Sequence, residues 1–119
     1  MFEVMIEESF SAAHRLLDYE GKTEEDIHGH TWKVQLYVTG EYIDTSGILI
    51  DFKVLSKDLK EVLDILDHTD LNSLKEFKDL SPSSELIAKF IYKNLKTKIP
   101  GLSRVSVLES EKHKASYWE

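Results

Sequence analysis

Three histidines have the spacing of a metal-binding site. His28 and His30 stand two residues apart at the entrance to a strand-like run. Side chains at i and i+2 of an extended chain point to the same face, roughly 6 to 7 Å apart, so both imidazoles can reach one ion. His14 shares the parity of the apolar side chains in an earlier strand-like segment, and pairing of the two segments would bring the three rings together. Three neutral imidazoles are the ligand set of a catalytic zinc; the alternative is that they are packed or solvated side chains.

Composition limits the possible classes of protein. The chain has 119 residues, 41% of them hydrophobic, and we expect one domain over residues 1–119. A net charge of −7 argues against a nucleic-acid or anionic-membrane partner. Because there is no long apolar run and the first residues are unlike a signal peptide, we expect a cytoplasmic protein. The absence of cysteine excludes a disulfide framework, a cysteine-ligated metal and a thiol base.

Alternating apolar and polar residues predict the strands. Residues 2–16 alternate in this way, and so do residues 31–40, whose apolar face has the parity of His28 and His30. Both histidines therefore point inward if the second strand begins early. The polar residues 18–26 are expected to form a loop. The remaining predictions are a short buried strand at 48–52, an alternating strand at 104–110 and a last extended piece at 115–118.

A period of three to four residues predicts two helices. The first begins at about residue 53 and ends near Asp67. Its apolar face is Leu55, Leu59, Val62, Leu63 and Leu66. The second begins around residues 80–82, with Ser81 as N-cap and Pro82 at the first position, and stops at Pro100 and Gly101. Its buried face is Leu86, Ile87, Phe90, Ile91 and Leu95.

The order of these elements predicts the fold class. Strands, two helices and further strands indicate an α+β domain with an antiparallel four-stranded sheet and two helices on one face. A small sheet of this kind leaves edge strands that need protection. We therefore expect the sheet to extend from one subunit to the next.

Short motifs run along the chain in a specific order. They are residues 10–16 (FSAAHRL), 28–30 (HGH), 47–52 (GILIDF), 66–68 (LDH) with Leu71 and Asn72, 82–85 (PSSE) and Glu109. The set resembles the 6-pyruvoyltetrahydropterin synthase family, which includes the bacterial 6-carboxytetrahydropterin synthases of the queuosine pathway. The resemblance implies the tunnelling fold, a homohexamer of two trimers whose sheets join into barrels, with active sites between subunits. It also implies 7,8-dihydroneopterin triphosphate as substrate and zinc held by His14, His28 and His30.

The resemblance gives further residues a role in binding the substrate. Glu109 matches the family's pterin-anchoring glutamate, and a carboxylate can accept two parallel hydrogen bonds from an amino-pyrimidine edge. It shares a face with Val105 and Val107, where an unpaired carboxylate is costly, unless position 109 already lies at the wet end of the strand. Ser83 and Ser84 match hydroxyl residues near the pterin, but both could simply start a helix.

Asp67 and His68 match the family's acid-base pair. In that role the aspartate orients the imidazole and the imidazole moves a proton. The alternative is a surface pair at the end of a helix. His113 matches nothing in the family pattern, and we expect it to be solvated.

The missing cysteine is the main departure from the family pattern. Members that make 6-pyruvoyl- or 6-carboxytetrahydropterin carry a catalytic cysteine four residues before the first histidine of HGH, where this chain has Glu24. A subgroup carries a glutamate three residues before that histidine, and Glu25 fits this pattern. The subgroup is associated with cleavage of the side chain to 6-hydroxymethyl-7,8-dihydropterin, a folate precursor.

A glutamate suits this cleavage chemically. Its reference pKa of about 4.3, against about 8.5 for cysteine, makes it a base at neutral pH. Zinc would polarise the side-chain hydroxyls and stabilise the developing oxyanion while the base takes a proton, as in a retro-aldol step. We expect Glu25 to be the base, with Glu24 as second candidate and His68 as proton carrier, unless residues 24–26 are only an acidic loop. The residues available to hold the triphosphate are Arg15, Lys22, Lys112 and Lys114.

Three functions remain open from the sequence. The first is a zinc-dependent lyase that makes 6-hydroxymethyl-7,8-dihydropterin. The second is the 6-carboxytetrahydropterin synthase reaction of the queuosine pathway, or the 6-pyruvoyl reaction, with a glutamate in place of the cysteine. The third is a pterin- or zinc-binding oligomer without catalysis. Turnover separates the third from the others, and the mass of the product separates the first two.

Overall fold

A long antiparallel pair of strands forms the centre of the main sheet. The computed structural model describes residues 1–19, 21–24 and 26–119, of which residues 22–24 are described by their backbone. Within these ranges the main sheet has five strands in the order β5-β1-β4-β6-β7. Their bounds are Phe2–His14 (β1), His28–Gly40 (β4), Thr69–Asp70 (β5), Leu102–Ser110 (β6) and His113–Tyr117 (β7). Only β5 runs parallel to its neighbour, β1. The α+β class is confirmed, whereas the predicted four-stranded antiparallel sheet is wrong, because the two residues of β5 are too few to show a period.

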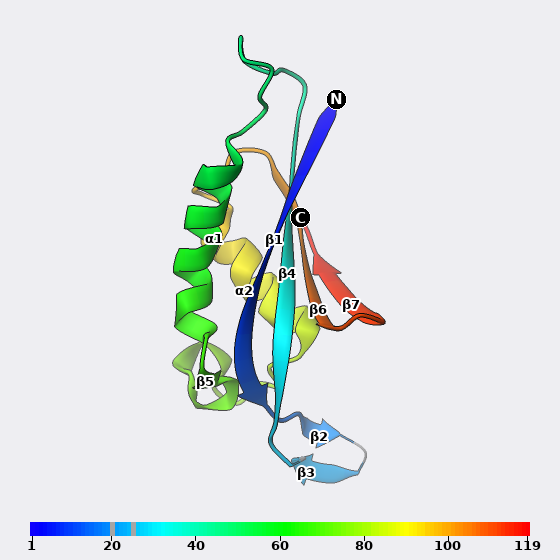
Figure 1. Ribbon diagram of the computed structural model, residues 1–119. Helices are drawn as coiled ribbons and strands as arrows, with labels where there is room; N and C mark the ends of the chain where they lie inside the picture. The colour runs from blue at the N-terminus through cyan, green and yellow to red at the C-terminus, as the bar shows by residue number, and fades with distance from the viewer. Residues whose placement is uncertain (20, 25) are drawn as a thin grey trace.

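Two helices cover one face of this sheet (Figure 1). They are α1 (Phe52–Leu66) and α2 (Ser84–Leu95), and the short 3-10 turns η1 (Leu71–Ser73) and η2 (Lys75–Phe77) lie between them. The face of β4 beneath the helices supplies Trp32, Val34, Leu36 and Val38, each at most 2% exposed. All five apolar residues predicted for the first helix are buried. In the part of the chain that the structure describes, no helix is long and apolar enough to cross a membrane.

The second helix begins later than predicted. Ser83 is its N-cap and accepts a hydrogen bond from the backbone N–H of Leu86 at 3.2 Å. Ser81 has a different partner, because its hydroxyl accepts from the backbone N–H of Leu17 at 2.7 Å. The prediction of Ser81 as N-cap with Pro82 at the first helical position is therefore wrong. The local sequence favours Ser81 because Pro82 follows it, but the hydroxyl of Ser81 is engaged by the tertiary contact with Leu17.

Residues 48–52 do not form the predicted strand. Asp44 organises a turn here, since its side chain accepts from the backbone N–H groups of Ser46 and Ile48 at 2.8 and 3.0 Å. Asp51 then caps α1 by accepting from the N–H of Lys53 at 2.8 Å. Leu49 and Ile50 pack against the core as irregular chain, whereas Ile48 and Phe52 are exposed, so the apolar run is neither a strand nor fully buried.

A small hairpin joins the two longest strands. The prediction of a loop at 18–26 is wrong in part, because this segment overlaps the antiparallel strands β2 (Leu17–Tyr19) and β3 (Lys22–Glu24). Gly21 lies between them with a φ of +74°, a conformation that glycine adopts without strain. In Figure 1 the hairpin projects beyond the ends of β1 and β4. It therefore connects the strand that ends at His14 to the strand that begins at His28.

The carboxylate of Glu119 ties the end of the chain to α2. It pairs with the ammonium groups of Lys93 and Lys96 and accepts a hydrogen bond from the hydroxyl of Tyr117 at 2.7 Å. These contacts, that of Lys93 first, lower the pKa of Glu119 from 4.5 to about 2. The stabilisation is fully present above pH 4.5 and is lost as the pH falls through about 2.

We therefore expect Glu119→Gln to lower the melting temperature by a few degrees at most above pH 4.5, because the contacts are exposed. The difference from wild type should shrink between pH 4.5 and about 2. Thermal unfolding followed by circular dichroism across this range measures it. Glu41→Gln, at an exposed position after β4, is the control. A pH-independent difference for Glu119→Gln would contradict the account.

Candidate metal centre

The pairing of β1 with β4 brings three histidines together. His14 lies directly opposite His28, and Ala12 lies opposite His30. The ring centroid of His14 lies 4.6 Å from that of His28 and 5.2 Å from that of His30. The ring centroids of His28 and His30 are 4.8 Å apart. The side chains come from two strands whose residues alternate between the faces of the sheet. This parity places all three rings at one point.

Hydrogen bonds set the tautomers of two of these rings. His14 is only 2% exposed, and its Nδ1 lies 2.7 Å from the carbonyl oxygen of Pro82. Because a carbonyl can only accept, Nδ1 carries the proton and Nε2 carries the lone pair. That buried Nε2 has no hydrogen-bond partner among the described residues. In the same way, Nδ1 of His28 donates to the carbonyl of Asp26 at 3.1 Å, which leaves Nε2 as its ligand atom.

Glu109 completes the cluster from β6. Its Oε1 lies 2.9 Å from Nε2 of His30 and 3.9 Å from Nε2 of His14. The ligand atoms of these four residues all lie within 4.8 Å of one another, so the group could hold a metal ion. A buried imidazole nitrogen without a partner is the observation that fits a metal best, because an unpaired polar atom in the core is costly. Imidazole and carboxylate ligands suit zinc.

Trp32 packs against two of the three histidine rings. It is fully buried, and its indole N–H donates to the carbonyl of Ala12 at 3.2 Å. Its ring lies edge-on to His14 and His30, with centroid distances of 4.8 and 5.1 Å. The indole therefore fixes the orientation of two of the three imidazoles.

A cavity of about 350 Å³ opens beside the cluster. The residues that line it are His14, Leu16, Tyr19, His28, Ser83, Ser84, Glu85 and Glu109. Ser83 and Ser84 thus lie at the cavity where α2 begins, although the Ser83 hydroxyl also caps the helix. Leu16, Tyr19 and Glu85 line the cavity without having been predicted to do so. Glu85 could have been found because it belongs to the PSSE motif, whereas nothing in the sequence pointed to Tyr19 while its segment was expected to be a loop.

Asp67 and His68 form a pair, but the described cavity beside Glu109 does not include them. Nδ1 of His68 lies 3.0 Å from Oδ2 of Asp67, and the other carboxylate oxygen accepts from the backbone N–H of Ser11 at 2.8 Å. The Ser11 hydrogen bond first, and His68 after it, lower the pKa of the Asp67 carboxyl despite partial desolvation. The side chain of His68 is 82% exposed, and it lines a separate hollow of about 440 Å³ with Gly29 and His30.

The backbone at His68 has a φ of 58°, which is uncommon for a residue other than glycine. Its N–H donates to the carbonyl of Ser11 at 2.6 Å, which anchors this conformation to β1. Such conformations persist only where the surroundings hold them, and they cluster at functional sites. The pair is therefore fixed at the edge of the sheet with its imidazole directed outward.

Of the two candidate bases, Glu24 is the last residue of β3. The backbone of Glu24 pairs with Leu17. Glu25 lies outside the described residues, as does the side chain of Glu24. Of the basic residues considered for the triphosphate, Lys112 is exposed in the β6–β7 turn and Lys114 is exposed in β7. The backbone N–H of Arg15 donates to the side chain of Asn72 at 2.8 Å.

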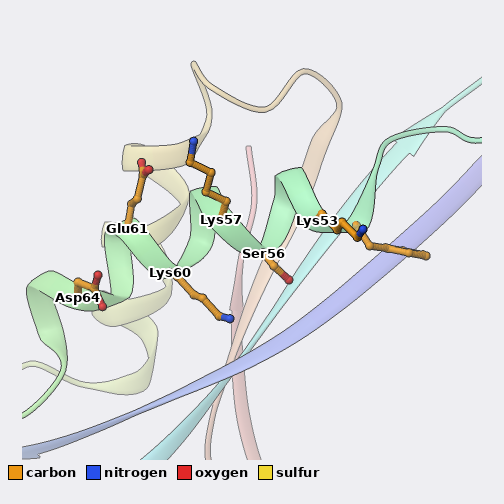
Figure 2. Close-up of a pocket in the computed structure, with 7 residues that line it drawn as sticks. Lys53, Ser56, Lys57, Lys60, Glu61 and Asp64 are labelled. Carbon is orange, nitrogen blue, oxygen red and sulfur yellow. The ribbon is translucent and has the colours of Figure 1, made fainter.

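A larger hollow, about 570 Å³, lies along the outer face of α1 and has a different character (Figure 2). It is lined by Phe52, Ser56, three lysines and two acidic residues. The charged residues are Lys53, Lys57, Lys60, Glu61 and Asp64. Nζ of Lys60 lies 3.9 Å from Oε1 of Glu8, and the hydroxyl of Ser56 donates to the same oxygen at 3.0 Å. These are ordinary contacts of a solvated helix face.

Comparison with known proteins identifies the family. The family model of 6-pyruvoyl tetrahydropterin synthase matches residues 3–119. The chain belongs to the 6-pyruvoyl tetrahydropterin synthase family. The resemblance found in the sequence is thereby confirmed. The solved structure of the 6-pyruvoyl tetrahydropterin synthase from Caenorhabditis elegans superposes with a TM-score of 0.85 at 29% identity, over 100% of this chain and 97% of that chain.

Two curated relatives of this family member have different activities in their names. The 6-carboxy-5,6,7,8-tetrahydropterin synthase of Synechocystis is 36% identical over 99% of this chain and 94% of the relative. The dihydroneopterin monophosphate aldolase of Pyrococcus furiosus is 35% identical over 85% of this chain and 83% of the relative. Membership of this family shows that the chain has a lyase-type function in pterin processing.

Proposed function

We propose that this chain is a zinc-dependent lyase that cleaves the side chain of 7,8-dihydroneopterin triphosphate to give 6-hydroxymethyl-7,8-dihydropterin, in folate-type synthesis. One observation carries the proposal: His14, His28, His30 and Glu109 converge on one point in a chain that contains no cysteine. Membership of the family supports a pterin substrate. The Pyrococcus furiosus aldolase supports cleavage of the side chain by a relative of similar length.

The residues of the cavity have distinct roles in this proposal. His14, His28 and His30 would hold the zinc, which would supply Lewis acidity toward the hydroxyl groups of the substrate side chain. Glu109 accepts hydrogen bonds from the amino-pyrimidine edge of the pterin, with Ser83 and Ser84 beside the ring. The ring is thereby oriented with its side chain toward the histidines.

Glu25 acts as the base, with Glu24 as second candidate. The base removes the proton of the hydroxyl on the second side-chain carbon, and that oxygen becomes an aldehyde as the bond between the first and second carbons breaks. The electron pair passes into the dihydropterin ring, and the first carbon then takes a proton, for which His68 is the carrier. The products are 6-hydroxymethyl-7,8-dihydropterin and a two-carbon phosphorylated aldehyde.

We propose that the active site lies between subunits of a homohexamer made of two trimers, with the sheets joined into barrels. Two observations support shared sites: β5 and β7 are edge strands of the described sheet, and His68 points outward from its own subunit. In this arrangement Asp67 and His68 serve the metal site of a neighbouring subunit.

A mixing experiment tests the shared site. His28→Ala and His68→Ala should each be nearly inactive alone, because one lacks a metal ligand and the other lacks the proton carrier. After dissociation and reassembly together, random pairing should restore roughly a quarter of the wild-type activity, since that share of interfaces combines an intact metal site with an intact His68. Refolding each variant alone is the control. No recovery in the mixture would place both residues in the same subunit's site.

The number of phosphates is a second question about the substrate. Of the described residues that line the cavity, none is lysine or arginine. The Pyrococcus furiosus relative is an aldolase of the monophosphate. Dihydroneopterin monophosphate is therefore the second candidate substrate, and kcat/KM for the two compounds decides between them. For the triphosphate, we propose Arg15, Lys22, Lys112 and Lys114, from this or a neighbouring subunit, as the basic residues.

The alternative functions give different products from the same assay. Zinc-loaded protein is incubated with 7,8-dihydroneopterin triphosphate and, separately, with the monophosphate, and the pterin is identified by chromatography and mass spectrometry. 6-Hydroxymethyl-7,8-dihydropterin supports the proposal. A 6-carboxy- or 6-pyruvoyltetrahydropterin would instead favour the synthase function, which the Synechocystis relative has in its name. Unchanged mono- and triphosphate would favour an oligomer that binds pterin or zinc without catalysis.

A further inference from the structure

The carboxylate of Glu109 faces two kinds of partner. Its Oε1 lies 2.9 Å from Nε2 of His30 and 3.9 Å from Nε2 of His14, and the latter is the nitrogen left with its lone pair by the Pro82 hydrogen bond. An ion bound by Nε2 of His30 would replace the contact that Glu109 now makes with that nitrogen. The carboxylate must then either join the ion as a ligand or turn away from it.

Charge favours joining the ion. Three neutral imidazoles leave the two positive charges of a divalent metal uncompensated, and the site is only partly exposed. A carboxylate whose oxygen already lies among the ligand atoms neutralises one of those charges and completes a four-coordinate site. Among the described residues, Glu109 is therefore the fourth ligand of the cluster.

The position of Glu109 in β6 also allows it to turn away. The pairing of β6 with β7 shifts register between Leu108 and Ser110, so Glu109 lies at a β-bulge. Bulges release a residue from the regular ladder and redirect its side chain. The Glu109 side chain is 35% exposed and lines the cavity with Ser83, Ser84 and Glu85. The same carboxylate can thus reach a ligand in the cavity.

We propose that Glu109 exchanges between the two partners: it binds the metal while the cavity is empty and leaves the metal when it accepts the amino-pyrimidine edge of a pterin. This rests on the proposed function in so far as the ligand is a pterin. The fourth position on the metal then opens only when the ring has docked, and the hydroxyl groups of a substrate side chain can occupy it. The Lewis acid is closed to other ligands until that point.

The exchange predicts that pterin and metal weaken each other's binding when the pterin has no side chain to replace the carboxylate. The two effects must be equal, because coupling between binding sites is reciprocal. 7,8-Dihydropterin is the probe, and the affinities for Zn²⁺ and Co²⁺ are measured by competition with a chelator. In wild type, the probe should lower metal affinity and change the visible absorption bands of bound Co²⁺.

Glu109→Gln should bind metal at least roughly 10-fold more weakly than wild type, and the probe should have no further effect on its metal affinity. Glu111→Gln, exposed two residues along the chain, is the matched control and should behave as wild type. Unchanged metal affinity in Glu109→Gln, or in wild type with 7,8-dihydropterin bound, would overturn the exchange. These measurements need no turnover, so loss of the proposed enzymatic function and loss of the exchange are separate results.

Discussion

Replacing His28 with alanine should remove metal binding while leaving the chain folded. Its Nε2 is one of three imidazole ligand atoms, and a carboxylate and two imidazoles hold a divalent ion far more weakly than the full set. We expect the metal affinity to fall by more than the roughly 10- to 100-fold that loss of an outer-shell partner costs. Metal content after dialysis and chelator competition measure the loss. Turnover should fall with it.

His28 is a better position for this test than His14. His14 is buried and bonded to Pro82, so its replacement would also remove core packing. His113→Ala is the matched control, because that imidazole is exposed and contacts only the Ser110 hydroxyl among the bonds described here. Full zinc occupancy in His28→Ala would refute the three-histidine site.

Replacing Glu25 with alanine should abolish turnover without loss of metal. A positioned general base contributes about 10² to 10⁴ in rate, so kcat should fall by that factor. The three histidines and Glu109 are unchanged, so Zn²⁺ affinity should stay at the wild-type value. Steady-state kinetics and metal analysis on the same preparation give both quantities.

The neighbouring acidic residues supply the controls for Glu25. Asp26→Asn keeps the backbone carbonyl that accepts from His28, so it should remain active. Glu24→Ala tests the second candidate base. An active Glu25→Ala with an inactive Glu24→Ala would move the role to Glu24. If both variants were active, neither Glu24 nor Glu25 would be the base.

The two-residue period of strands made the histidine cluster predictable. His14, His28 and His30 share the parity of the buried side chains around them, and the register of β1 against β4 follows from burying those apolar faces. The parity of Glu109 with Val105 and Val107 brought it to the same point. The alternation of residues along the strands therefore predicted the positions of these four side chains, which residue propensities alone would not have done.

Other features depend on contacts that no local pattern contains. Ser81 and Ser83 are both N-cap residue types, but Ser83 caps α2 while the hydroxyl of Ser81 accepts from the backbone N–H of Leu17, a contact distant in sequence. The apolar run at 48–52 does not pair as a strand, because Asp44 accepts backbone hydrogen bonds in a turn and Asp51 caps α1; of its apolar residues, Leu49 and Ile50 pack against the core. The hairpin that brings Tyr19 to the cavity is built from strands of three residues, which are too short to show a period.

The measurement that tests the account most directly is cleavage of the side chain in deuterated water. Zinc-loaded protein is given 7,8-dihydroneopterin triphosphate in D₂O, and both fragments are identified by mass spectrometry. The account predicts 6-hydroxymethyl-7,8-dihydropterin with a deuterium on its new hydroxymethyl carbon, together with an equimolar two-carbon phosphorylated aldehyde. A pterin product that keeps more than one side-chain carbon would contradict it.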